Sequence, residues 1–228
     1  KQFFLSNPDY LQQFDALYVP QNLDLLKSYA VYQVYSGFAP SADIKLRDLQ
    51  RNYALQRFGI AQARDDKETA SRMVQSMLSY EFGQIYMKNH CTAAIINDVK
   101  NMVNEIRNVY KLRLEANNWL SPETRGKAVD KLNSLRVFVG GPAADDKPII
   151  ESMPDVISPK DGGDLLANVM HNGVLEKQQV HALLGKDFNP DKWYAFDPQD
   201  VNAAYIPENN SITIPAGILQ PPFYDAKA

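Results

Sequence analysis

The three histidines, at positions 90, 171 and 181, are the side chains best suited to bind a transition metal or to exchange a proton near neutral pH. A zinc-binding helix of the His-Glu-x-x-His type needs two histidines four residues apart, and no pair here has that spacing. His171 and His181 lie on one predicted helix, but ten residues correspond to about 15 Å along a helix axis, which is too far for one ion. We therefore predict that His90, His171 and His181 are structural or solvent-facing and that this segment holds no metal site.

Cys91 is the single cysteine, so the sequence excludes an internal disulfide and a Cys-x-x-Cys zinc site. Its neighbour His90 suggests a reactive thiol, but adjacent helical residues point about 100° apart, and we favour a structural role. Two pairs of adjacent aspartates lie in predicted loops and match no calcium loop. The Asn-Asn-Ser sequence at 209–211 is a formal glycosylation sequon, which arises often by chance, and we do not expect it to be used.

The composition is that of a folded, nearly neutral protein. Of the 228 residues, 45% are apolar and 22% are charged, enough for one large domain or for one domain and a piece of another. The net charge of −3 gives no strong field toward nucleic acid or an anionic membrane, and the aromatic residues mostly follow apolar helical stripes. No window approaches the roughly 18 uninterrupted apolar residues of a membrane span. We expect no nucleic-acid partner and no membrane contact by this segment.

Most of the chain has helical periodicity. Asn7-Pro8 supplies a cap and a first-turn proline for a helix that continues until Pro20. Further helices are predicted over 23–35, ending at Ser36-Gly37, and over 43–58, ending at Gly59. Two amphipathic helices follow, with apolar stripes over 74–86 and 95–110.

The second half of the chain changes from helical to strand-like patterns. Ser121-Pro122-Glu123 starts a helix whose inward face reaches Leu135 before the glycines and proline at 140–142 break it. The segment 143–159 reads as a connection with a short strand, and a helix, or a helix broken near Asn172-Gly173, spans 161–184. Two strand-like runs then flank a four-residue turn, namely 201–206 and 211–214. The prediction is a mainly α, multi-helix fold with a boundary near Gly185 and a short β-hairpin near the C-terminus, which needs further sheet or helices to pack on.

The segment after the hairpin is rigid by composition. Three prolines and one glycine surround Ile218 and Leu219 directly after the second strand, and such rigidity usually positions another group. Here the chain reads Asn-Ala-Ala-Tyr at 202–205 and Pro-Ala-Gly-Ile-Leu-Gln-Pro-Pro-Phe at 215–223. These residues resemble the neprilysin and endothelin-converting-enzyme family of zinc metallopeptidases, which carries an Asn-Ala-x-Tyr strand followed by this proline-rich segment.

The resemblance extends upstream over most of the chain, weakly before about Asp43 and strongly after Ser71. Residues 118–128 resemble the family's Trp-Met-x-x-x-Thr-x-x-x-Ala helix start, and 137–142 resemble its Ile-Gly-x-Pro exit. Residues 81–87 resemble its Gly-x-Leu-Tyr helix, and Trp193 matches the tryptophan that precedes the Asn-Ala strand.

The resemblance implies a substrate-binding role for Asn202, Ala203 and Ala204. In the family an extended peptide adds itself to the Asn-Ala strand and is held through its backbone. The Asn202 side-chain amide would bind the substrate main chain, and Ala203 would contribute its carbonyl. Ala204 would line the pocket for the residue before the scissile bond, and this pocket would be roomier than in relatives with an aromatic residue there. Tyr205 is expected to pack within the protein.

The zinc site implied by the family lies outside residues 1–228. In the family a His-Glu-x-x-His helix follows shortly after the proline-rich segment, and a downstream Glu completes the ligand set. We therefore expect a longer parent protein, a zinc-dependent metalloendopeptidase that cleaves peptides. In it, residues 1–184 form the helical, chamber-forming domain and residues 185–228 begin the α+β catalytic domain. Residues 1–228 alone would bind no zinc and be inactive, and their partners would be peptide substrates and the remainder of the catalytic domain.

Location and one alternative function stay open at this stage. The first residues lack the apolar stretch of a signal peptide, and a chain that opens at Lys1 reads as a processed or truncated product. Family resemblance implies a location outside the cytoplasm, periplasmic, in the cell envelope or secreted. The alternative function is a non-catalytic helical module that binds a peptide or a partner chain.

Overall fold

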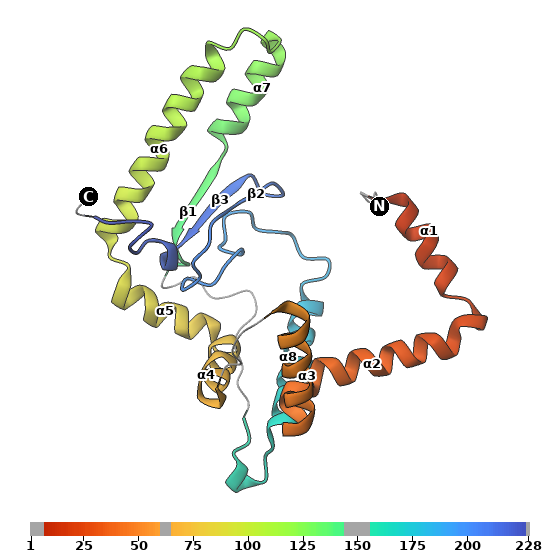
Figure 1. The fold of residues 1–228 in the computed structure, drawn as a ribbon. Helices are drawn as coiled ribbons and strands as arrows, with labels where there is room; N and C mark the ends of the chain where they lie inside the picture. Colours follow the sequence, from red (N-terminus) through yellow and green to blue (C-terminus); the bar gives the residue numbers. More distant parts are fainter. Residues whose placement is uncertain (1–6, 60–64, 144–155, 227–228) are drawn as a thin grey trace. The chain divides into compact units, whose positions relative to one another are not determined.

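The computed structural model describes residues 7–59, 65–143 and 156–226 (Figure 1). In these ranges the chain is mainly helical with a three-stranded sheet, which confirms the predicted fold class. The described residues belong to two compact units, one drawn from 7–59 and 156–171 and the other from 66–143 and 172–226. No helix in the described ranges is long and apolar enough to cross a membrane. The boundary near Gly185 stays a prediction.

The first unit begins with helices whose caps are readable in the sequence. Helix α1 spans Pro8–Leu17, and the Tyr10 N–H donates to Asn7 Oδ1 at 3.2 Å. After a short 3₁₀ turn, Pro20–Asn22, helix α2 spans Leu23–Ala42. Helix α3 spans Ile44–Phe58 and packs against α2; it is capped by Asp43 and ends at Gly59, which has a φ of 64°. The predicted positions of α1 and α3 are confirmed.

The predicted end of α2 at Ser36-Gly37 is wrong, because the helix continues to Ala42 and contains Pro40. A glycine inside a helix costs only about 1 kcal/mol relative to alanine, which packing can offset. Pro40 has no N–H to donate to the carbonyl of Ser36 four residues earlier. The Gln50 side chain of α3 donates to that carbonyl instead, with Nε2 3.3 Å from the oxygen. A contact from the next helix thus satisfies the group that the proline leaves unpaired.

The first unit also contains the chain around Ile157 and the start of helix α8, which spans Leu165–Ala182. The buried Asn168 side chain accepts from the Ile157 N–H at 3.0 Å and donates to its carbonyl at 2.9 Å. A 3₁₀ turn, Pro159–Asp161, lies between them in the sequence. Helix α8 runs unbroken through Asn172 and Gly173, so the alternative of a broken helix is wrong.

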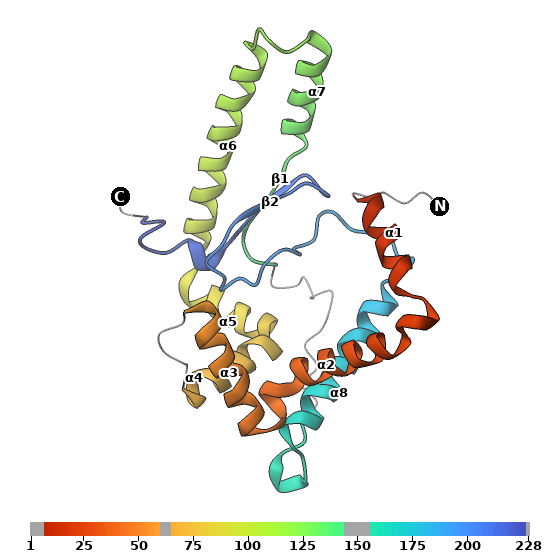
Figure 2. The same cartoon turned by 45° about the vertical axis from the view of Figure 1, so that its right-hand side comes forward.

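The second unit contains four helices that precede the sheet in sequence, Asp66–Met77 (α4), Ser79–His90 (α5), Ala93–Glu115 (α6) and Pro122–Asn133 (α7). The helix predicted from the 74–86 stripe is divided at Leu78, whose backbone is not helical although its hydrogen bonds to both sides persist. The predicted cap of α7 is confirmed, because Ser121 Oγ accepts the Thr124 N–H at 3.1 Å. Thr92 caps α6 in the same way, with Oγ1 3.3 Å from the Ile95 nitrogen. Helices α6 and α7 run side by side as a hairpin in both views (Figures 1 and 2).

The sheet has the order β1-β3-β2, with β1 at Arg136–Gly140, β2 at Ala204–Ile206 and β3 at Ser211–Pro215. Strands β2 and β3 form the predicted antiparallel hairpin, with a shorter first strand than expected. Strand β1 was not predicted, because 136–139 reads as the end of the preceding helix, yet it pairs parallel with β3. It supplies the additional sheet that an isolated hairpin lacks.

The core of the second unit lies between α6 and the sheet. Val99 of α6, Val139 of β1 and Leu219 are 4–6% exposed and contact one another. Leu219 follows the 3₁₀ turn Ala216–Ile218, so the proline-rich segment is itself part of this core. Packing of this segment holds β3 against α6.

Candidate functional site

Strand β2 is an edge strand of the sheet. It pairs with β3 on one side, and no strand in the described ranges pairs with its other side. Asn202 and Ala203 precede it and are exposed, and Ala204, its first residue, is half-buried. The structure therefore brings the three predicted site residues to the start of an unpaired strand edge. Free N–H and C=O groups on such an edge can pair with an extended peptide.

The Asn202 side chain is oriented by its own backbone. Its Oδ1 accepts a hydrogen bond from the Ala203 N–H at 2.8 Å. Within the described ranges its Nδ2 has no hydrogen-bond partner, and a carboxamide oxygen can accept a second bond. The amide retains both donor and acceptor capacity at the strand edge.

The turn between β2 and β3 is attached to the end of α7 through Asn210. This residue has a φ of 49°, in the left-handed region that asparagine tolerates better than most residues. Its Nδ2 donates to the Lys131 carbonyl at 2.8 Å and to Ser134 Oγ at 3.0 Å. Its Oδ1 accepts from the Tyr205 hydroxyl at 3.1 Å, and Lys131 Nζ lies 5.5 Å from the centre of the Tyr205 ring. Asn210 thus links β2, the turn and helix α7.

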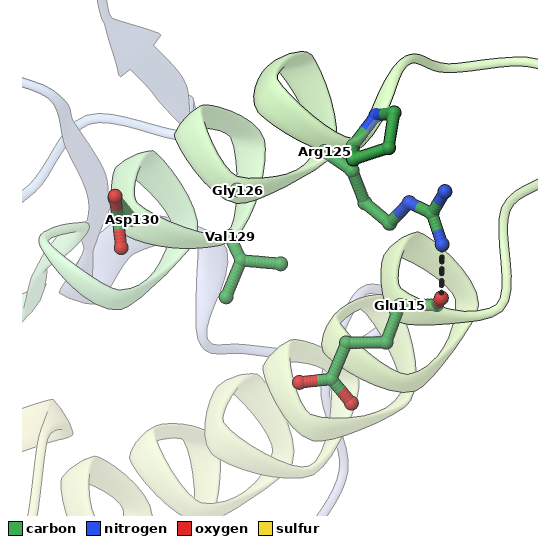
Figure 3. Close-up of a pocket in the computed structure, with 6 residues that line it drawn as sticks. Glu115, Arg125, Gly126, Val129 and Asp130 are labelled. Carbon is green, nitrogen blue, oxygen red and sulfur yellow. Dashed lines mark hydrogen bonds between the residues drawn. The ribbon is translucent and has the colours of Figure 1, made fainter.

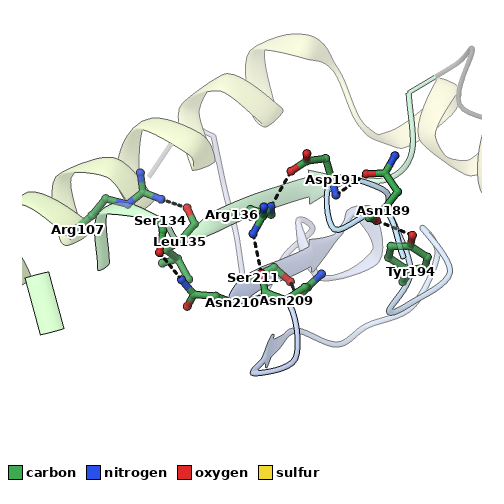
Figure 4. Close-up of polar contacts among 10 residues, drawn as sticks. All are labelled: Arg107, Ser134, Leu135, Arg136, Asn189, Asp191, Tyr194, Asn209, Asn210 and Ser211. Carbon is green, nitrogen blue, oxygen red and sulfur yellow. Dashed lines mark hydrogen bonds and ion pairs between the residues drawn. The ribbon is translucent and has the colours of Figure 1, made fainter. Parts of the chain in front are cut away.

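Arg136 at the start of β1 also contacts this turn (Figure 4). Its Nε lies 2.6 Å from Asp191 Oδ1, and its Nη1 donates to the Asn209 carbonyl at 3.0 Å. The Arg136 N–H donates to the Asn210 carbonyl at 2.9 Å. The Asn209 side chain is 8% exposed and accepts from Ser211 Oγ at 2.6 Å, so the sequon asparagine points into the protein.

The sequence analysis does not identify Arg136 and Asn210 as the residues that hold the turn between β2 and β3. The available signal was the pair of asparagines between two strand-like runs, which indicates a residue with positive φ in the turn. Their bonds to Asp191, Asn209, Lys131 and Ser134 join residues between 55 and 79 positions apart, so spacing within one element could not reveal them.

The proline-rich segment is attached to the rest of the unit at three points. The Gly217 N–H donates to the Pro198 carbonyl at 2.8 Å. Gln220 Nε2 donates to the His90 carbonyl at 2.8 Å, and the Tyr224 hydroxyl donates to Asp98 Oδ2 at 2.8 Å. These bonds support the prediction of a rigid segment after the hairpin.

The histidines and the cysteine lie at the end of α5 and on α8. His90 ends α5 and its ring lies 4.7 Å from that of Tyr86, whereas His171 and His181 lie on α8. Within the described ranges no group of three or more His, Cys, Asp or Glu side chains could hold a metal ion. Cys91 packs against the core, and burial raises the pKa of its thiol, which disfavours the reactive thiolate.

Asp197 is the one carboxylate in the described ranges with a resolved pKa shift. Burial raises the pKa of Asp197, the nearby Asp200 carboxylate raises it further, and a hydrogen bond with Ser79 opposes both effects. The Asp197 N–H donates to Asp200 Oδ2 at 3.0 Å. The pair shapes the turn that supports Gly217.

A groove of about 460 Å³ lies at the tip of the α6–α7 hairpin, away from the sheet (Figures 1 and 3). Arg125 reaches across it from α7, and its Nη1 donates to the Glu115 carbonyl in the last turn of α6 at 3.1 Å. An arginine that binds a terminal helix carbonyl is a common helix cap. We interpret the groove as part of the hairpin contact and not as a ligand site.

The fold is that of solved metallopeptidase structures. A model of the N-terminal part of peptidase family M13 matches residues 1–142, and a second model of the same family matches residues 202–228. The chain belongs to peptidase family M13. This membership confirms the resemblance to the neprilysin and endothelin-converting-enzyme peptidases.

Individual proteins agree with the family models. Neprilysin-11 of Caenorhabditis elegans is 28% identical over 218 residues, which are 95% of this chain and 26% of that protein. The crystal structure of PepO from Lactobacillus rhamnosis has 30% identity and a TM-score of 0.83, over 96% of this chain and 34% of that one. The Mycobacterium tuberculosis zinc metalloprotease Zmp1 has 28% identity and a TM-score of 0.80, over 97% and 32%. The chain spans about a third of the length of the neutral endopeptidases of Lactococcus lactis that it matches.

Proposed function

We propose that residues 1–228 are part of a zinc-dependent metalloendopeptidase that cleaves peptides. They would supply its helical domain, residues 1–184, and the first part of its catalytic domain, residues 185–228. Membership of peptidase family M13 supports the reaction class, and the similarity to proteins named as zinc metalloprotease and neprilysin supports the metal and the substrate class. The observation that carries the role of this segment is the unpaired edge of β2 with Asn202 and Ala203 exposed beside it.

In this proposal the substrate adds to the sheet as a further strand beside β2. Its backbone pairs with the free edge, so binding is largely independent of substrate sequence. The Asn202 amide binds a substrate peptide group as donor and acceptor, and the Ala203 carbonyl accepts a substrate N–H. The small Ala204 side chain leaves room for a bulky residue before the scissile bond. Arg136 and Asn210 hold the hairpin in place and do not touch the peptide.

Zinc would polarise the scissile carbonyl and activate a water molecule when bound. Residues 1–228 do not fit a zinc site, because His90, His171 and His181 lack the spacing of a zinc helix. We therefore assign the ligands and the general base to another part of the parent protein, and we assign no step of the hydrolysis to residues 1–228. The helical domain would enclose the chamber that admits peptides and excludes folded proteins. The location outside the cytoplasm stays a prediction.

The test is peptide hydrolysis by the parent protein and its Asn202→Ala variant. We expect hydrolysis that a zinc chelator abolishes, and a loss of about tenfold in kcat/KM in the variant, because a hydrogen bond to the substrate contributes about 1 kcal/mol or slightly more. Asn118→Ala, which removes an exposed amide from the α6–α7 loop, is the matched control and should change nothing. An unchanged kcat/KM in Asn202→Ala would exclude the strand role, whereas a parent protein without zinc-dependent hydrolysis would exclude the enzyme.

The alternative of a non-catalytic binding module is not favoured. An exposed strand edge also suits partner binding, but it does not distinguish a module from an enzyme. The family model and the names of the relatives indicate peptidases.

A further inference from the structure

Helix α6 carries a row of exposed apolar side chains on one face. Met102, Ile106, Val109 and Tyr110 follow one another at intervals of one to four residues, and they are 41%, 57%, 48% and 58% exposed. This spacing places them on one stripe of the helix. Scattered exposed apolar residues are ordinary, but a continuous row of four large ones is typical of a surface that packs against another element.

The neighbouring face of α6 is occupied by α7 and β1. Val103, Arg107 and Leu114 are partly buried, and the Arg107 guanidinium donates to the Leu135 carbonyl between α7 and β1. The contacts of α6 with α7 and with β1 explain why the side chains on this face are partly buried. The exposed row lies beside this covered face, so folding of the described elements leaves it open.

The same stripe is covered nearer the start of the helix by the C-terminal segment of the chain. Ile95 and Val99 continue the row toward the N-terminal end of α6, and both belong to the core cluster with Leu219 and Tyr224. The Tyr224 hydroxyl bonds Asp98, which is four residues, about one helical turn, before Met102. Figure 1 shows this segment beside the lower half of α6, on the side away from α7. The contacts of the C-terminal segment with α6 therefore end one turn before Met102, the first residue of the exposed row.

We propose that the row Met102, Ile106, Val109 and Tyr110 is the docking surface for the part of the catalytic domain that follows residue 228 in the parent protein. This inference rests on the proposed function, which requires a longer chain. Two observations favour this occupant: the surface continues an apolar contact that residues 218–224 already make, and the relatives are about three times as long as this chain. Tyr224 contacts Asp98, one helical turn before Met102, so the chain that follows Tyr224 would start next to this row.

The first test is the accessibility of a thiol on the row in the parent protein. Ile106→Cys places it on the row, and Leu112→Cys places it on another face of α6, at a residue that is 65% exposed. Both variants are labelled with a thiol reagent, and the rate is read by mass spectrometry from the peptide that contains α6. We expect labelling at position 106 to be at least about tenfold slower than at position 112. Equal rates would overturn the proposal.

A second measurement distinguishes the occupants. Ile106→Asp should lower the Tm of the parent protein by several degrees, and Leu112→Asp should not. In the Ile106→Cys variant, protection of the introduced thiol that disappears on dilution to a monomer would overturn the proposal in favour of a second copy of the chain. Neither readout involves catalysis, so protection in a protein without zinc-dependent hydrolysis would refute the proposed function and leave the docking surface intact.

Discussion

At the scale of single residues, Asn210 has a structural role larger than its place in a turn suggests. One carboxamide makes three hydrogen bonds, to the Lys131 carbonyl, to Ser134 Oγ and from the Tyr205 hydroxyl. The same residue adopts a backbone conformation that side chains rarely favour. The position of the edge strand β2 therefore depends on both the side chain and the φ angle of one asparagine.

Substitutions at Asn210 should separate these two contributions. Asn210→Gly keeps the φ angle accessible and removes the bonds, so the free energy of unfolding should fall by about 1–2 kcal/mol. Asn210→Ala should cost about 1 kcal/mol more, because alanine resists the left-handed region. Urea denaturation measures both, with Glu208→Ala in the same turn as an exposed control. A glycine variant as stable as the wild type would show that the side-chain bonds contribute nothing.

Asp197 should make the stability of the protein depend on pH. Its pKa is raised in the folded state by burial and by Asp200, so the folded state binds a proton more tightly than the unfolded state. The free energy of unfolding should therefore fall as the pH rises from about 4, where a free aspartate titrates, through the raised pKa. Asp197→Asn keeps an acceptor for Ser79 and should lack this fall. Thermal unfolding across this range measures the difference, and parallel curves for the two proteins would contradict the prediction.

At the scale of elements, two glycines should respond in opposite ways to the same substitution. A Cβ on Gly217 would lie 2.4 Å from the carbonyl oxygens of Gln199 and Asp200, so Gly217→Ala must displace backbone and should cost about 2 kcal/mol or more. A Cβ on Gly126, inside α7, would meet nothing within 4 Å. Gly126→Ala should stabilise the protein by about 0.5–1 kcal/mol through helix propensity. Chemical denaturation measures the free energy of unfolding of both variants. An unchanged free energy of unfolding in Gly217→Ala would show that the turn at 198–200 is free to move.

The elements also show which local signals predict structure. The caps Asn7 and Ser121 predict the starts of α1 and α7 correctly, because a cap acts within one helical turn. The end of α2 was predicted wrongly, because Gln50 satisfies the carbonyl that Pro40 leaves unpaired. Strand β1 is not predicted by the local pattern, because its partner β3 lies 75 residues later in the sequence. Local patterns carry no information about such a pairing.

For the whole molecule, residues 1–228 should be separable from the zinc chemistry of the proposed parent protein. The sequence holds three histidines without the spacing of a zinc helix, so this segment alone should take up no stoichiometric zinc and hydrolyse no peptide. The parent protein should do both. Elemental analysis after gel filtration measures the zinc, and cleavage of a fluorogenic peptide measures the hydrolysis. Zinc-dependent cleavage by residues 1–228 alone would contradict the prediction.

The amino-acid sequence predicts the family, the mainly helical class, several helix starts and a candidate site at Asn202, Ala203 and Ala204. These properties follow from motifs and from interactions within a few residues, which remain readable without a fold. The fold is needed to show that β1 joins the hairpin and leaves β2 at the edge of the sheet, and that Arg136 and Asn210 fix the turn of the hairpin. The fold also shows that the C-terminal segment covers the apolar stripe of α6 near Asp98 and that the stripe is exposed from Met102 onward. Each of these depends on groups that are distant in sequence and meet only when the core closes around Val99, Val139 and Leu219.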